Sequence, residues 1–127
     1  MTMWTTWGDA MGLAVIRPND IVYFNLDPTR GHETCKIRPC LVVGIPTDSQ
    51  GKRGPSGIAI ILPITSRQHN FWTEVPIRKR GQMKGDSYIL CHQIRAVDLS
   101  RAGDKIAEAE PSELKRVKQV LRILLSI

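Results

Sequence analysis

Short runs of β-branched and aromatic residues, most of them followed by Gly, Pro, Asn, Asp or Ser, set the pattern of this chain after residue 19. Runs of this composition between turn signals are typical of β-strands. The runs that predict strands are Asp20–Leu26, Pro39–Ile45, Ile58–Leu62, Phe71–Ile77 and Ser87–Cys91. The connections are too short for repeated crossover helices, so we expect mostly antiparallel pairing in a small barrel or sandwich.

The run Ile58–Leu62 is apolar at every position. Such a run is consistent with a strand buried on both faces, so we expect it at the centre of the sheet. The preceding segment, Thr47–Gly57, is crowded with Gly, Ser, Pro, Lys and Arg and is predicted to be a long exposed loop. The pattern in Gln93–Ala102 predicts no definite element, and Lys105–Ala107 is predicted to be a last short strand.

The end of the chain has a helical pattern instead. Pro111, Ser112 and Glu113 are residues that helix N-termini prefer. Apolar residues then recur at helical spacing, which predicts an amphipathic helix packed on the core. The residues of this stripe are Leu114, Val117, Leu121, Leu124 and Leu125.

Length and composition indicate one domain. A chain of 127 residues that is 42% hydrophobic can bury one real core and is short for two. Residues 1–16 have no Lys or Arg and no clear period, so we expect a mobile N-terminal arm before a single domain at 17–127. Met11 could serve as a second start. A secretory signal would need a charged first region, so a cytoplasmic location is expected.

No run of about 18 apolar residues is present, so the sequence predicts no membrane span. The three cysteines, Cys35, Cys40 and Cys91, are an odd number without CxxC spacing, which fits reduced thiols. Eighteen Lys and Arg against twelve Asp and Glu give a formal charge of +6. That charge favours an anionic partner, such as nucleic acid, an acidic protein segment or a lipid surface, without choosing among them.

Two loops carry most of the ionisable and hydroxyl side chains that could perform chemistry. The first, Gly31–Pro39, contains Glu33 and Arg38, and the second follows Ile58–Leu62 and contains Thr65, Ser66 and Arg67. These groups suit a polyanionic ligand. From the residues alone, a structural salt bridge between Arg38 and Glu33 and a simple turn signal at Thr65 are the commoner interpretations.

The order of motifs from Asp20 onward resembles the MazF/PemK family of toxin–antitoxin ribonucleases. The matching motifs are Asp20–Glu33, Arg38-Pro39 with its apolar strand, Pro63–Ser66 and Cys91–Arg95. The resemblance implies a mainly β fold with a C-terminal helix, an SH3-like barrel of the MazF/PemK/CcdB type. It also implies a homodimer that cuts single-stranded RNA at a short sequence without a metal or other cofactor, causes growth arrest and is silenced by a cognate antitoxin.

The same resemblance gives the catalytic residues as Arg38 and Thr65, with a weaker case for Glu33. In RNA cleavage by the substrate's own 2′-OH, a guanidinium can stabilise the phosphoryl charge, which suits Arg38. The hydroxyl of Thr65 can position the phosphate, and the carboxylate of Glu33 can take the 2′-OH proton. His32 competes with Glu33 for the base role because imidazole changes charge near neutral pH.

Residues around these loops are predicted to bind the RNA. They are Gly31, His32, Lys36, Ser66, Arg67, Trp72 and Gln93, with Phe71, His69 and Asn70 as further candidate base readers. Trp72 and Phe71 are more often core residues, because aromatic side chains bury large areas. Four cations crowd the turn Arg78–Lys84, which would line the RNA approach or be a solvated turn. A dimer would carry twice +6, or +12, so RNA binding should weaken steeply with salt.

Two other functions compete with the ribonuclease, and a metal site is a further alternative for four of the residues. A zinc site at His32, Cys35, Cys91 and His92 is disfavoured, because neighbours on a strand, such as Cys91 and His92, point to opposite faces. A non-enzymatic gyrase inhibitor of the CcdB type would need no phosphate site, and its C-terminal Trp has no counterpart in Leu125-Ser126-Ile127. An RNA-binding module of the same fold would bind RNA and leave it intact.

Overall fold

The computed structural model describes residues 16–28, 31–33, 36–46 and 57–127. The expected N-terminal arm, except Ile16, and most of the loop Thr47–Gly57 lie outside these residues. The strands are β1 Asp20–Asn25, β2 Ile37–Gly44, β3 Ile58–Thr65, β4 Glu74–Ile77, β5 Ser87–Leu90, β6 Arg95–Asp98 and β7 Ala102–Glu108. The helices are the 3₁₀ turns η1 Cys91–Gln93 and η2 Leu99–Arg101 and the α-helix α2 Pro111–Leu125.

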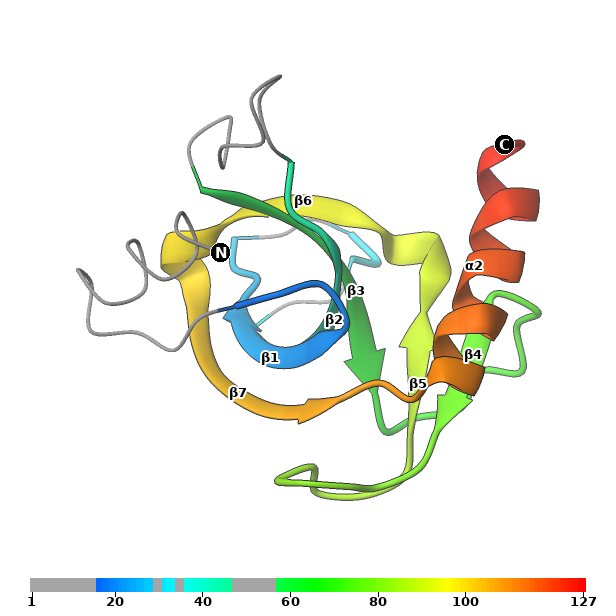
Figure 1. Cartoon of the computed structure of the whole chain (residues 1–127), viewed down its shortest axis with the longest axis horizontal. Coiled ribbons are helices and arrows are strands. Elements are labelled where there is room, and N and C mark those ends of the chain that lie inside the picture. The colour runs from blue at the N-terminus through cyan, green and yellow to red at the C-terminus, as the bar shows by residue number, and fades with distance from the viewer. Residues whose placement is uncertain (1–15, 29–30, 34–35, 47–56) are drawn as a thin grey trace.

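The strands form one antiparallel sheet in the order β4-β5-β3-β2-β1-β7, with β6 also paired to β3. Figure 1 shows the sheet curling around a common centre, with α2 on its outer side beside β4 and β5. The predicted mainly β fold with a C-terminal helix is therefore confirmed, and the curl is not closed among the described strands. The predicted central place of β3 is confirmed as well, since β2, β5 and β6 all pair with it.

Strict alternation along the strands builds two cores, one on each face of the sheet. The inner core, inside the curl, contains Val22, Phe24, Cys40 and Ile61 among others. The outer core lies between the sheet and α2, and it takes the alternate residues, such as Ile21. Successive side chains of a strand point to opposite faces, so one apolar strand can serve both cores.

The N-terminal edge of the described chain joins the inner core. Ile16, which the sequence pattern assigned to the arm, is 1% exposed and packs against residues of β1 and β2. The packed unit therefore includes at least one residue before position 17. No helix among the described residues is long and apolar enough to cross a membrane.

Strand β2 begins at Ile37 and β3 ends at Thr65, so Arg38 and Thr65 lie on strands and not in the loops to which the sequence pattern assigned them. Two further predicted strand boundaries are wrong for local reasons. The strand expected at Phe71–Ile77 begins only at Glu74, because Asn70 has a left-handed φ of 60° and a turn bonds Glu74 N–H to the Phe71 carbonyl. The strand expected at Ser87–Cys91 ends at Leu90, where η1 begins. The segment without a predicted element contains β6, and the predicted strand at Lys105–Ala107 is part of the longer β7.

Helix α2 begins as predicted and packs through part of the predicted stripe. Glu110 and Glu113 form a reciprocal capping box at its first turn. Val117 is buried, and Leu114, Leu121 and Leu124 pack against the outer core. Leu125 does not: it is 45% exposed, and the unpredicted Val120 is buried in the same core.

The turn between β4 and β5 docks beside α2 through one of its four cations. Arg80 donates to both carboxylate oxygens of Glu113, at 2.7 and 2.5 Å. Gly81, next in sequence, has a φ of +53°, and a Cβ there would overlap the carbonyl oxygen of Ile106. The interpretation of Arg78–Lys84 as a cluster of solvated cations is therefore wrong for Arg80.

Candidate active site

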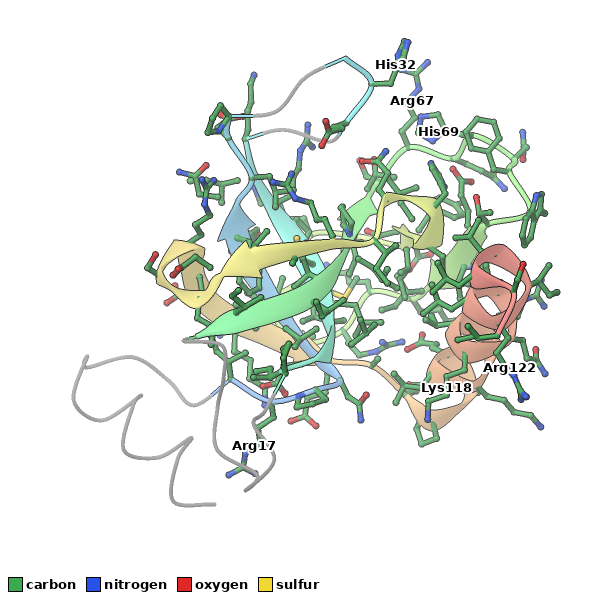
Figure 2. All side chains as sticks on the ribbon, turned by 90° about the horizontal axis from the view of Figure 1, so that it is seen from above. Arg17, His32, Arg67, His69, Lys118 and Arg122 are labelled. Atoms are coloured by element: carbon green, nitrogen blue, oxygen red, sulfur yellow. The ribbon has the colours of Figure 1, made fainter. Side chains whose placement is uncertain are left out.

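The two loops singled out in the sequence lie at one end of the molecule. Figure 2 shows His32, Arg67 and His69 at this end and Arg17 at the opposite one. His32 belongs to the connection between β1 and β2, and the other two follow β3. His32 and His69 line the same pocket, so their closeness in the view is real.

The pairing of β2 with β3 brings the Arg-Pro and Thr-Ser motifs together. Cys40 is opposite Pro63 in the antiparallel register. Continued by two residues, this register would set Arg38 opposite Thr65. Arg38 is exposed and lines a pocket of about 200 Å³ with Ser66 and Lys84 at its polar edge, which we name the Arg38 pocket.

Thr65 is half-buried at the end of β3, where it forms a local turn. Its Oγ1 accepts a hydrogen bond of 3.2 Å from the backbone N–H of Arg67. The predicted turn interpretation is therefore correct as local structure, and the Thr65 hydroxyl hydrogen is free to donate elsewhere, because an accepting oxygen keeps its own O–H. Ser66, the next residue of this turn, lines the Arg38 pocket.

Glu33 lies in a separate hollow from Arg38. It lines a pocket of about 380 Å³ with His32, His92, Gln93, Ile94 and Arg95, which we name the Glu33 pocket. Its carboxylate, with the side chain 58% exposed, is 4.0 Å from Nη1 of Arg95. The structure thus shows an ion pair for Glu33 that sequence reasoning did not anticipate.

A third hollow of about 300 Å³ gathers His32, His69 and His92, all the histidines of the chain, with Phe71, Leu90 and Gln93. We name it the histidine pocket. Phe71 stacks on His69 with ring centroids 5.7 Å apart and contacts His92 edge-on at 5.6 Å. Phe71 and Trp72 are 54% and 58% exposed, so the alternative that they are core residues is wrong.

Buried polar groups hold the rim of the histidine pocket in place. The Glu74 side chain is only 3% exposed and accepts hydrogen bonds from the backbone N–H of His69 at 3.1 Å and from its Nδ1 at 2.9 Å. Thr73 Oγ1 and His92 Nδ1 are 2.8 Å apart. These bonds fix the imidazoles against which Phe71 packs, so the aromatic face is presented rigidly.

We name the end of the molecule where the three pockets lie the mouth. Hydrogen bonds hold the backbone at the base of the loop between β1 and β2. Lys36, which is exposed with a φ of 66°, donates its backbone N–H to Asp27 Oδ1 at 2.8 Å. Arg101 donates to the carbonyl oxygens of Asn25 and Asp27. Gly31 at the loop tip has a φ of 61°, a conformation that favours glycine.

The described thiols are not poised for chemistry. Burial raises the pKa of Cys40 to about 12, against a smaller opposite effect from the charge of Arg95. Burial also raises the pKa of Cys91 to about 12. Cys35 lies outside the described residues, and no group of three or more His, Cys, Asp or Glu among the described ones could hold a metal ion. Cys91 and His92 lie in η1, not on a strand, so the strand argument about their directions was wrong.

The family comparison decides what kind of protein carries this site. A family model described as PemK-like, MazF-like toxin of type II toxin–antitoxin system matches residues 17–125. The chain belongs to this family. The resemblance read from the four motifs is confirmed.

Relatives of this PemK/MazF-family toxin match it over most of their length. The curated protein Endoribonuclease EndoA of Bacillus subtilis is 30% identical over 114 residues, which are 89% of this chain and 97% of that one. The crystal structure of MazF from Deinococcus radiodurans has a TM-score of 0.73 at 28% identity, covering 90% of this chain and 99% of that one. A MazE–MazF structure from the same organism has a TM-score of 0.68 at 28% identity, with coverage of 90% and 98%.

Sequence reasoning missed three site residues of this PemK/MazF-family toxin. Glu74 and Thr73 carried no signal, because a polar residue at a strand start is ordinarily exposed. Arg95 closes the Cys91–Arg95 motif and stands at the start of a short apolar alternation. The motif gave Arg95 no role of its own, and only the fold shows that it reaches Glu33.

Proposed function

We propose that this PemK/MazF-family toxin is a sequence-specific, metal-independent endoribonuclease that cuts single-stranded RNA. The observation that carries the proposal is the Arg38 pocket, which Arg38 and Ser66 both line, with Thr65 next to Ser66 in sequence. A guanidinium together with hydroxyls suits a phosphodiester ligand. In addition, a relative of this chain is named an endoribonuclease.

The proposed reaction uses the RNA's own 2′-OH as nucleophile. Its oxygen bonds to the adjacent phosphorus as the bond from phosphorus to the 5′ oxygen breaks, leaving a 2′,3′-cyclic phosphate and a 5′-OH. Negative charge grows on the phosphoryl oxygens, and the Arg38 guanidinium stabilises it with paired donors. The Thr65 hydroxyl donates to a phosphoryl oxygen and orients the phosphate for in-line attack.

Glu33 is proposed to take the 2′-OH proton, with His32 as the competing base. Both line the Glu33 pocket, while Arg38 lines its own. A ribose and its phosphate bound across the mouth would present the 2′-OH to one pocket and the phosphoryl oxygens to the other. The separation of acid–base and electrostatic groups therefore fits a ligand that spans both pockets.

The histidine pocket is proposed to read an unstacked RNA base on the exposed face of Phe71. Base stacking on an aromatic ring contributes about 1–3 kcal/mol per base, so Phe71→Ala should weaken RNA binding roughly 5- to 150-fold. Trp72 is similarly exposed but does not line this pocket, so Trp72→Ala should weaken binding less. Anisotropy with an RNA that has a 2′-deoxyribose at the cut site measures both affinities without cleavage. An equal or larger loss with Trp72→Ala would contradict this placement of the base.

The remaining residues of the mouth are proposed to contact the RNA backbone. They are Gly31, His32, Lys36, Ser66, Arg67 and Gln93. We further propose that the toxin works in the cytoplasm as a homodimer and that a cognate antitoxin neutralises it. Solved relatives include a complex of MazF with MazE. Co-purification with the product of a neighbouring gene, and reversal of growth arrest by that product, would test the antitoxin.

Digestion of a long single-stranded RNA in EDTA tests the proposed activity. Discrete cuts with 5′-OH and 2′,3′-cyclic phosphate ends are expected, and their positions would give the recognition sequence. Folded, antitoxin-free protein that leaves many RNA sequences intact would overturn the proposal and favour the binding module or the gyrase inhibitor.

A further inference from the structure

Arg95 occupies an unusual place for an arginine. It is the first residue of β6, and it pairs with Ile61, a residue of the inner core. Residues directly opposite each other in a sheet point to the same face, so the Arg95 side chain starts on the inner side of the curl. Arg95 also lines the Glu33 pocket together with Glu33, so its side chain reaches from the inner side of the curl to the candidate site.

The guanidinium of Arg95 is only partly satisfied. Its side chain is 26% exposed, and Nη1 is buried without a hydrogen-bond partner among the described residues. The Glu33 carboxylate at 4.0 Å is near enough to attract Nη1 and too far to accept a hydrogen bond from it. A buried N–H without a partner destabilises a fold, and such local costs in native proteins tend to coincide with functional positions.

The Glu33 carboxylate needs a partner that fixes its position. It stands on the loop between β1 and β2 with its side chain more than half exposed. A general base must be held within hydrogen-bond reach of the proton it takes, and such bonds are often long until the ligand binds. Arg95 belongs to a strand of the sheet, so its guanidinium can hold the carboxylate of Glu33, which lies on a loop, in a fixed position.

We propose that Arg95 is a positioning residue for Glu33: when RNA fills the mouth, the pair closes to hydrogen-bond distance and aims the carboxylate at the 2′-OH. This inference rests on the proposed ribonuclease function. In the bound state, Nη1 of Arg95, which has no hydrogen-bond partner among the described residues, donates to the Glu33 carboxylate. RNA excludes water from the mouth, which strengthens the attraction between the two charges.

Three variants test the proposal in single-turnover cleavage. Arg95→Met removes the charge and keeps a long apolar stem, and it should slow cleavage at least tenfold. Arg95→Lys keeps the charge without the planar fork and should restore part of the rate. Arg122→Met removes an equal charge from α2, on another side of the molecule (Figure 2), and should cleave at the wild-type rate.

Two further readouts separate positioning from a merely structural role. The affinity of Arg95→Met for RNA with a 2′-deoxyribose at the cut site should stay within about threefold of wild type. Its melting temperature should not fall, because the variant removes a buried donor that has no partner. Activity lost at unchanged affinity and undiminished stability is the signature of a positioning residue.

A double mutant completes the test, because residues that act through one another are not additive. Adding Arg95→Met to Glu33→Gln should cause little further loss of rate. The proposal is overturned if Arg95→Met cleaves normally, if its affinity falls as much as its rate, or if its full effect persists in the Glu33→Gln background. Full activity of Glu33→Gln would also overturn it. Failure of the wild-type protein to cut RNA would instead refute the proposed function itself.

Discussion

Arg38→Ala is expected to reduce RNA cleavage by roughly 10²- to 10³-fold, the usual cost of removing one donor that stabilises a developing oxyanion. Arg38 is exposed near the start of β2, so its loss opens no cavity in either core and the fold should be retained. The charge that forms on the phosphoryl oxygens would then meet hydroxyls and the Lys84 ammonium, without the paired donors of a guanidinium. Single-turnover rates on one defined RNA, with melting curves for each variant, measure the effect.

Arg38→Lys is the matched variant for this prediction. A lysine keeps the positive charge and loses the bidentate geometry, so an intermediate rate is expected. Arg122→Ala controls for a general loss of positive charge and should change the rate little. A folded Arg38→Ala protein that cleaves at the wild-type rate would remove Arg38 from the reaction.

Glu113→Ala should produce the largest loss of stability, about 2–4 kcal/mol in the free energy of unfolding. Its carboxylate accepts two bonds from Arg80 and one of 2.8 Å from the backbone N–H of Glu110. The Arg80 and Glu113 side chains are 20% and 10% exposed, so deletion of one leaves a largely desolvated partner. Breaking a buried pair costs about 3–5 kcal/mol, and we place this pair lower because Arg80 keeps some contact with water. Urea unfolding followed by circular dichroism measures the change.

Glu110→Ala is the internal control for this pair. Glu110 lies 3.7 Å from the same arginine, but its side chain is 61% exposed. Its loss removes mainly the capping bond, which contributes about 1 kcal/mol. An equal loss of unfolding free energy in the two variants would show that the Arg80–Glu113 pair contributes no more to stability than the capping bond does. Both variants should keep wild-type cleavage per folded molecule, because the pair lies away from the pockets of the mouth.

The strands of this fold were readable because alternation and turn residues agree. The Asp20–Leu26 run and the apolar Ile58–Leu62 run each match a strand within a few residues. Strand β6 was not predicted, because four residues with two charges carry too weak a local signal. Its pairing with β3 is decided by tertiary contacts, which also give both faces of β3 a core to fill.

The residues of the candidate site were likewise predictable from the sequence only in part. Arg38, Thr65 and Glu33 could be chosen from their motifs, because Arg38 and Thr65 lie at strand ends and Glu33 lies in the loop before β2. The partner of Glu33 could not, since Arg95 is far away in sequence and reaches the mouth only through the register of β6. The cations of Arg78–Lys84 look alike in sequence, and only the fold separates Arg80, bound to Glu113, from Lys84, beside Arg38.

The most direct test of the central claim uses a single deoxyribose. An RNA containing the recognition sequence is made with a 2′-deoxyribose only at the nucleotide whose 2′-OH should attack, and it is incubated with the wild-type protein in EDTA. We expect this RNA to bind with nearly unchanged affinity and to remain uncut at that position, while the all-ribose RNA is cut. Cleavage of the deoxy-substituted RNA at the same position and rate would contradict attack by the 2′-OH, and with it the roles given to Arg38, Thr65 and Glu33.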